Sequence, residues 1–283
     1  MTPARRHRER IAAIVAAADP KLVVSSAEGG RTPLVPVART PAMNHLERTA
    51  AAAIVAAPEN STSAESRVAA QIVLRLTHDL RRLKEIRSID RKIDAKREML
   101  PEYEAWVNAV IEADAGVGAG TAADVVPTYM VWLIDTGAFM AALDLVPFLL
   151  RHKVDMPKRY ERDVPTIVVE LIADAALKAQ NAGECFVLDV LSRANDLTAD
   201  LDIHDQVRAK LLKAIGIEQL RIAEDMDAAD SAVGLETTLA TLREAQRLND
   251  RIGVRDRIKR ADKLLAAVNA AAAPTDTSGT PAA

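Results

Sequence analysis

The stretch VVPTYMVWLIDTGAFMAALDLVPFLL, residues 125–150, decides the fold class of this chain. Its apolar side chains recur every three or four positions on both sides of Asp135-Thr136-Gly137. We therefore expect two helices within residues 124–152, joined at this tripeptide. The small Ala142 would let the two helices approach closely, and larger apolar side chains would fill the seam: Phe139, Leu143 and Val146. This spacing is typical of the second helix of a tetratricopeptide-like hairpin.

The composition also favours helices. Of the 283 residues, 53 are alanines and only 11 are glycines, and no segment alternates convincingly between apolar and polar residues. We expect an all-α fold, in which a long basic amphipathic helix is followed by degenerate tetratricopeptide-like helical hairpins, with disordered or loosely ordered ends. No stretch approaches the roughly 20 apolar residues of a membrane span, and no secretory signal is visible, so we expect a reducing cytoplasm and no membrane contact. The single Cys185 excludes an intramolecular disulfide and a multi-cysteine zinc site.

The sequence divides into four predicted segments. We expect a flexible basic and Ala/Pro-rich arm, the long basic amphipathic helix, a helical-hairpin core and a disordered tail, at residues 1–64, 65–99, 100–269 and 270–283. Within the arm, short Ala-rich helices are expected at 9–18 and 43–57. In the core, helices are expected at 101–116, 124–152 (two), 166–182, 184–195, 205–215, 217–229, 235–249 and 253–269.

The segment expected as a long helix has an unusual charge. Residues 75–97 contain nine cationic residues against four acidic ones, although the whole chain has a net charge of −3. Strict heptads fail near Arg87 and Asp90, so the pattern fits a helix packed into a helical oligomer as well as it fits a dimeric coiled coil.

Several runs resemble, in the same order, the small terminase subunit of contractile-tailed temperate phages with cohesive genome ends, usually named the terminase endonuclease subunit. The runs are MLPEYEAWVNAVIEADAG, VVPTYMVWLIDTGAFMAALDLVPFLLRHKVDMP, ALKAQNAGE, VRAKLLKAIG and LREAQRLNDRIGVRDRIKR, within residues 66–262. The C-terminal tail departs from the family pattern, because it is strongly basic in relatives and here is uncharged apart from Asp276.

This resemblance implies a role in viral genome packaging in the cytoplasm of a host bacterium. A small terminase subunit recognises the cohesive-end region of concatemeric phage DNA, commonly forms a ring, and delivers the DNA to a large subunit with the ATPase motor. The family is credited with directing or performing the staggered cut, so the resemblance implies an endonuclease, with Mg²⁺ if cleavage is intrinsic. A different interpretation of the helical hairpins is a protein-interaction scaffold without direct DNA contact.

The sequence shows no nuclease or ATPase motif, and a Walker motif is absent, so we do not expect this chain to be the packaging motor. No cofactor or metal site is predicted with a defined ligand set. The best carboxylate cluster lies between Asp196 and Asp205, and its candidate catalytic residues are Asp200, Asp202 and Asp205. The competing interpretation is that Asp202 or Asp205 caps the following helix and that the others are solvated.

Basic residues give the stronger functional pattern, because lysine and arginine neutralise DNA phosphates and release counterions. Four basic regions are available, in the arm, in residues 75–97, in the loop after residue 150 and in residues 243–263. We favour the first two, with these DNA-binding candidates: Arg5, Arg6, Arg8, Arg10, Arg81, Arg82, Lys84, Arg87, Arg91 and Lys92. The competing interpretation is a solvated mixed-charge surface. Since no helix-turn-helix pattern is visible, sequence preference would come from bending DNA around an oligomer.

Overall fold

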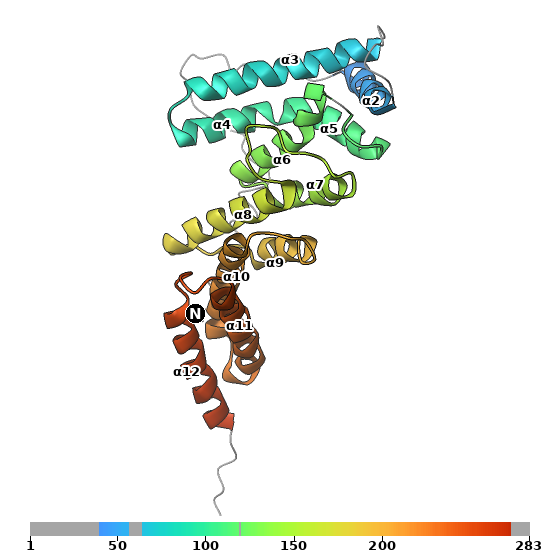
Figure 1. Cartoon of the computed structure of the whole chain (residues 1–283). Coiled ribbons are helices and arrows are strands. Elements are labelled where there is room, and N and C mark those ends of the chain that lie inside the picture. The colour runs from blue at the N-terminus through green and yellow to red at the C-terminus, as the bar shows by residue number, and fades with distance from the viewer. Residues whose placement is uncertain (1–39, 57–63, 119, 273–283) are drawn as a thin grey trace, which may run out of the picture.

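The computed structural model describes residues 40–56, 64–118 and 120–272, and within these ranges every regular element is a helix (Figure 1). The all-α prediction is therefore confirmed. The elements are α2 (Pro41–Ala56), α3 (Ala64–Glu85), α4 (Ile89–Met99), α5 (Pro101–Ala113), the short 3₁₀ helix η1 (Gly120–Asp124), α6 (Val125–Asp135), α7 (Phe139–Arg151), α8 (Val164–Asn181), α9 (Leu188–Leu197), α10 (Asp205–Asp225), α11 (Ala228–Leu248) and α12 (Arg255–Ala272). None of these helices is both long enough and apolar enough to cross a membrane.

The helices form an elongated stack, with α3 at one end and α12 at the other (Figure 1). One large apolar cluster extends from α2 to the first half of α10. A smaller cluster joins the second half of α10 to α11 and α12. The two tryptophans lie in the large cluster, as predicted: Trp106 and Trp132 are each 2% exposed. Trp132 also meets Tyr103 edge to face, with 5.6 Å between ring centroids.

The central hairpin has the predicted form. Helices α6 and α7 are separated by residues 136–138, where Gly137 adopts a φ of +87° that favours glycine. The Thr136 hydroxyl donates to the carbonyl of Trp132 at 2.9 Å and closes the end of α6. Ala142, Leu143 and Val146 are buried, as the spacing predicts. The likeness to tetratricopeptide hairpins stays a prediction.

The prediction of one long helix over residues 65–99 is wrong. The segment forms two helices, α3 and α4, linked by residues 86–88. Ser88 adopts an extended backbone conformation, and its Oγ accepts a hydrogen bond from the Arg91 backbone N–H at 3.4 Å, as a helix N-cap does. The Arg82 guanidinium then meets the Glu98 carboxylate at 2.8 Å across the two helices. The segment is therefore a helical hairpin.

Part of the predicted arm belongs to the fold. The helix expected at 43–57 is present as α2, and it packs against both α3 and α5. Ala50 on α2 is fully buried, and Arg48 pairs with Glu112 of α5 at 2.8 Å. The helix expected at 9–18 and most of the predicted tail lie outside the described residues.

The two helices expected at 205–215 and 217–229 are instead one continuous helix, α10. Gly216, which lies between the two expected ranges, is inside the helix and lets α11 approach. A Cβ atom on residue 216 would lie 2.4 Å from Cδ2 of the buried Leu242 on α11. The glycine is therefore required by close helix packing and does not end a helix.

A buried carboxylate lies between the two apolar clusters. Glu218 of α10 is 1% exposed. It accepts hydrogen bonds from the Gln180 amide at 2.9 Å and from the Phe186 backbone N–H at 3.0 Å. Arg221, one turn further along α10, donates to it at 2.8 Å. These bonds connect α10 to α8 and to the loop that precedes α9.

Gly216→Ala is expected to lower the free energy of unfolding, because Leu242 is enclosed and cannot move away from the new methyl group. Overpacking of this kind costs about 1–3 kcal/mol, which exceeds the gain of about 1 kcal/mol in helix propensity. Urea unfolding followed by circular dichroism measures the difference. In the double variant Gly216→Ala/Leu242→Ala, the two effects should be less than additive, since the clash is absent.

Gly234→Ala is the matched control, because it lies inside α11 and its Cβ would meet Ala223 Cβ at an ordinary 3.5 Å. Here only the helix propensity changes, and stability should rise by up to about 1 kcal/mol. A Gly216→Ala protein as stable as the parent would show that α10 and α11 are not in close contact at this point.

Candidate functional site

The link between α3 and α4 brings together a group of cationic side chains. We call residues 81–92 the hairpin tip; Figure 1 shows this turn at one edge of the stack. Leu83 points into the core, so the cationic residues around it face outward. Among the described residues, five cations of the tip form no ion pair with a carboxylate: Arg81, Lys84, Arg87, Arg91 and Lys92. Glu85 and Asp90 are the acidic residues of the tip.

The other cations of this region are already engaged. Arg82 pairs with Glu98 at 2.8 Å, and Arg97 pairs with Asp94 at 2.9 Å on the same helix. Lys96 is largely buried and binds Asp135, at the end of α6, at 2.5 Å. The structure thus divides the predicted DNA-binding residues: five are free of carboxylates, Arg82 is paired, and Arg5, Arg6, Arg8 and Arg10 lie outside the described residues. Only the Arg97–Asp94 spacing could have revealed such pairing in the sequence.

Through the middle of the stack, most arginines are paired with carboxylates. Such pairs include Arg151–Asp114, Arg162–Glu170 and Arg193–Asp144, and Lys210 pairs with Asp174 in the same region. Exposed pairs of this kind contribute little to stability, but each neutralises a positive charge. The hairpin tip is therefore one place on the described surface where uncompensated positive charge is concentrated.

The candidate catalytic carboxylates lie around the start of α10. Asp202 and Asp205 line a hollow of about 470 Å³ together with Glu161, Asp163 and His204. His204 is the N-cap residue of α10, and no side chain caps this helix, so the expectation that Asp202 or Asp205 forms the cap is wrong. Asp205 occupies the first turn, where a negative charge is favourable.

The carboxylates do not converge as metal ligands do. In the part of the chain that the structure describes, no group of three or more His, Cys, Asp or Glu side chains is arranged to hold a metal ion. Asp200, Asp202 and Asp205 therefore do not form such a group. A role for them in catalysis stays a hypothesis.

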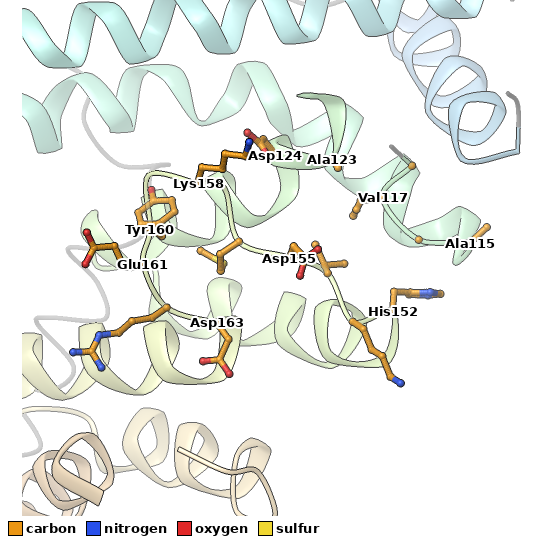
Figure 2. Close-up of a pocket in the computed structure, with 16 residues that line it drawn as sticks. Ala115, Val117, Ala123, Asp124, His152, Asp155, Lys158, Tyr160, Glu161 and Asp163 are labelled. Carbon is orange, nitrogen blue, oxygen red and sulfur yellow. The ribbon is translucent and has the colours of Figure 1, made fainter. Parts of the chain in front are cut away.

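A larger hollow of about 970 Å³ lies between the loop after α5 and the loop between α7 and α8. Figure 2 shows Asp124, Asp155, Glu161 and Asp163 around it, with Lys158 on the same loop as three of them. The lining contains these four carboxylates against three cations, so it attracts phosphate less than the hairpin tip does.

At the edge of this hollow, Asp114 is held by two neighbours. It accepts hydrogen bonds from His152 at 2.8 Å and from the Arg151 guanidinium. The hydrogen bond from His152, followed by that from Arg151, lowers the pKa of the Asp114 carboxyl. These contacts fasten the end of α5 to the end of α7, which is a structural task.

Comparison with known proteins gives consistent matches. The family model of the phage small terminase subunit matches residues 73–206. The chain is 35% identical to the terminase, endonuclease subunit of Escherichia phage P2 over 226 residues, which are 80% of this chain and 85% of that protein. It is 24% identical to the probable terminase, endonuclease subunit of Haemophilus phage HP1 over 195 residues, 68% of each chain. No solved structure matches.

Lys96→Met is expected to reduce stability, because Asp135 would keep a half-buried charge without its partner. The cost should be about 2 kcal/mol, between the values for exposed and buried ion pairs. Arg97→Ala is the control on the same helix, since the Arg97 and Asp94 side chains are 58% and 67% exposed. It should cost less than about 0.5 kcal/mol. If the two substitutions lowered the free energy of unfolding equally, the Lys96–Asp135 pair would contribute no more to stability than the exposed Arg97–Asp94 pair.

Proposed function

The chain belongs to the phage small terminase subunit family, which acts in phage DNA packaging, and from this premise we propose that it recognises the cohesive-end region of concatemeric phage DNA. In this proposal it directs the cut at that region together with a large ATPase subunit, in the cytoplasm of the host bacterium. The observation that supports direct DNA contact is the hairpin tip, where five cations form no ion pair among the described residues and outnumber the two carboxylates Glu85 and Asp90.

The hairpin tip suits the phosphate backbone for a physical reason. A phosphate that meets a paired arginine must compete with the carboxylate already bound to it, whereas a cation without such a partner gains the full benefit of counterion release. Arginines can also hold phosphate oxygens with two hydrogen bonds, and three of the five cations are arginines. The α3–α4 turn lies at one edge of the stack (Figure 1), and Arg81, Lys84, Arg87 and Arg91 are exposed there.

Sequence preference would come from an assembly of several copies. We propose a homo-oligomeric ring, as the family resemblance implies, in which hairpin tips repeat around the duplex. Several weak contacts on one duplex increase the effective concentration of each further contact. A DNA sequence that bends easily at the required positions would cost less free energy to deform. The ring would therefore prefer such sequences without reading their bases directly.

The cut itself is proposed to depend on the large subunit. Phosphodiester cleavage by a metal-dependent site needs clustered carboxylates that hold divalent ions. The family name endonuclease subunit describes the relatives, and for this chain we propose that it selects where the cut is made. If cleavage is intrinsic instead, the residues to test are Asp200, Asp202 and Asp205, with Mg²⁺ as the metal.

Replacement of three tip cations tests the interface. Arg87→Ala/Arg91→Ala/Lys92→Ala should weaken binding to a labelled duplex, measured by fluorescence anisotropy at several salt concentrations. The slope of log affinity against log salt should become shallower by about 2–3, because each lost phosphate contact removes about 0.9. The fold should be unaffected, since the three side chains form no ion pair within the described residues.

A control of equal charge uses cations that are already paired. Arg48→Ala/Arg193→Ala/Arg247→Ala also removes three positive charges, but from partners of Glu112, Asp144 and Glu244. Its salt slope should match that of the parent protein. Equal losses in both triple variants would show that only the net charge matters and would argue against a defined interface at the tip.

A cleavage assay separates recognition from catalysis. The purified chain is mixed with Mg²⁺ and an end-labelled cohesive-end duplex, beside a shuffled duplex, at about 0.15 M salt. We expect a selective gel shift without cutting, and staggered cutting only when the large subunit is added. Cutting by the chain alone would assign the nuclease to it. An absent shift in every arm would favour the interaction scaffold without direct DNA contact.

A further inference from the structure

A second group of cations lies at the opposite end of the stack, on α12 and the turn before it. Arg251, Arg255, Lys259 and Lys263 are exposed, and none forms an ion pair within the described part of the chain. The spacing of four residues places the last three along one face of α12. We call these four residues the α12 cation row.

Two charged neighbours of the row on α12 form ion pairs with other helices, whereas Arg257 donates only to the Gly253 carbonyl at 3.5 Å. Arg260 pairs with Glu224 of α10 at 2.5 Å, and Asp262 pairs with Arg243 of α11 at 2.8 Å. Ala261 is fully buried against the smaller apolar cluster. The side of α12 that packs on α10 and α11 therefore has compensated charges, whereas the outward side has four cations without carboxylate partners.

The row starts at a hollow of about 470 Å³, which Arg251, Arg255 and Lys259 line together with Gly253 and two carboxylates, Asp250 and Asp256. The turn before α12 is held in place by a contact with α10. Lys213 of α10 donates to the Ile252 carbonyl at 2.8 Å, and Gly253 has a φ of +77°. The cations are therefore presented by a fixed turn and the rigid start of a helix, with positive charges in excess over negative ones.

We propose that the α12 cation row is a second contact site for the phosphate backbone of duplex DNA, distinct from the hairpin tip. The inference rests on the proposed function, because it takes DNA as the polyanion. Both the α3–α4 turn and the start of α12 lie toward the same edge of the stack in Figure 1, with α8 between them. One subunit would thus hold a duplex at two points, and the packed helices between them would fix the spacing.

Lysine protection tests both sites in one experiment. The full chain is treated with a water-soluble acetylating reagent, with and without cohesive-end duplex, and acetylation of each lysine is measured by mass spectrometry. Lys84 and Lys92 report on the hairpin tip, and Lys259 and Lys263 report on the row. Lys153, in the loop after α7 and outside both cation groups, is the internal control, since it is exposed and forms no ion pair within the described residues.

We expect the duplex to slow acetylation of all four reporter lysines several-fold and to leave that of Lys153 unchanged. Protection of Lys84 and Lys92 without Lys259 and Lys263 would overturn the second site and leave the proposed function intact. Protection at neither site would contradict direct DNA binding as well. If the large subunit protects Lys259 and Lys263 and the duplex does not, the row is a protein-docking surface and the inference is wrong.

A triple variant provides an independent measurement. Arg255→Ala/Lys259→Ala/Lys263→Ala should make the salt slope shallower by about 2–3 relative to the parent, as expected for lost phosphate contacts. The charge-matched variant Arg48→Ala/Arg193→Ala/Arg247→Ala serves again as the control. A slope equal to that of the control would exclude a phosphate contact at the row, whatever the hairpin tip does.

Discussion

The relative placement of the two halves of this molecule depends on the buried carboxylate of Glu218. Burial of an ionised group is costly unless donors replace the lost water. Here a side-chain amide, a backbone N–H and a guanidinium supply them, from Gln180, Phe186 and Arg221. Because Glu218 lies where the large apolar cluster gives way to the small one, these bonds add to the close packing of Gly216 against Leu242 and fix α10 at this point. The distance between the hairpin tip and the α12 cation row follows from that rigidity.

Pairing of charges, more than their number, determines what the surface can bind. The chain is acidic overall, with a formal net charge of −3. Most arginines in the middle of the stack are paired with carboxylates. At about one Debye length from such a pair, the electric fields of its two opposite charges largely cancel. The remaining positive charge is then local, and a polyanion approaching the molecule would be drawn to its two ends.

Local periodicity was sufficient to predict the helices and much of the core. The α6–α7 hairpin and the buried Trp106 and Trp132 follow from apolar spacing alone. The break at Ser88 was missed, because apolar residues recur at helical spacing through Ile86, Ile89 and Ile93 whether the helix continues or turns back. The continuity of α10 was missed because a glycine that ends a helix and one that admits a neighbouring helix look alike in sequence.

The sequence predicted which residue types form the candidate site, but not which of the cations are free of ion pairs and can bind DNA. The basic character of residues 75–97 is evident from the sequence. That Lys96 is unavailable depends on Asp135, 39 residues away, and such a contact has no local pattern. Likewise, convergence of Asp200, Asp202 and Asp205 depends on the path of a loop, which short-range spacing does not determine.

The elongated stack has a thermodynamic consequence for any ligand that binds its ends. Each layer touches mainly the layers next to it, so opening of a terminal layer breaks one interface, whereas opening in the middle breaks two. Terminal layers are therefore the first to exchange their amide hydrogens. Since both cationic groups lie on terminal layers, a bound duplex would suppress local unfolding at both ends. The fraction of protein bound to DNA and the fraction with ordered terminal helices would therefore rise together.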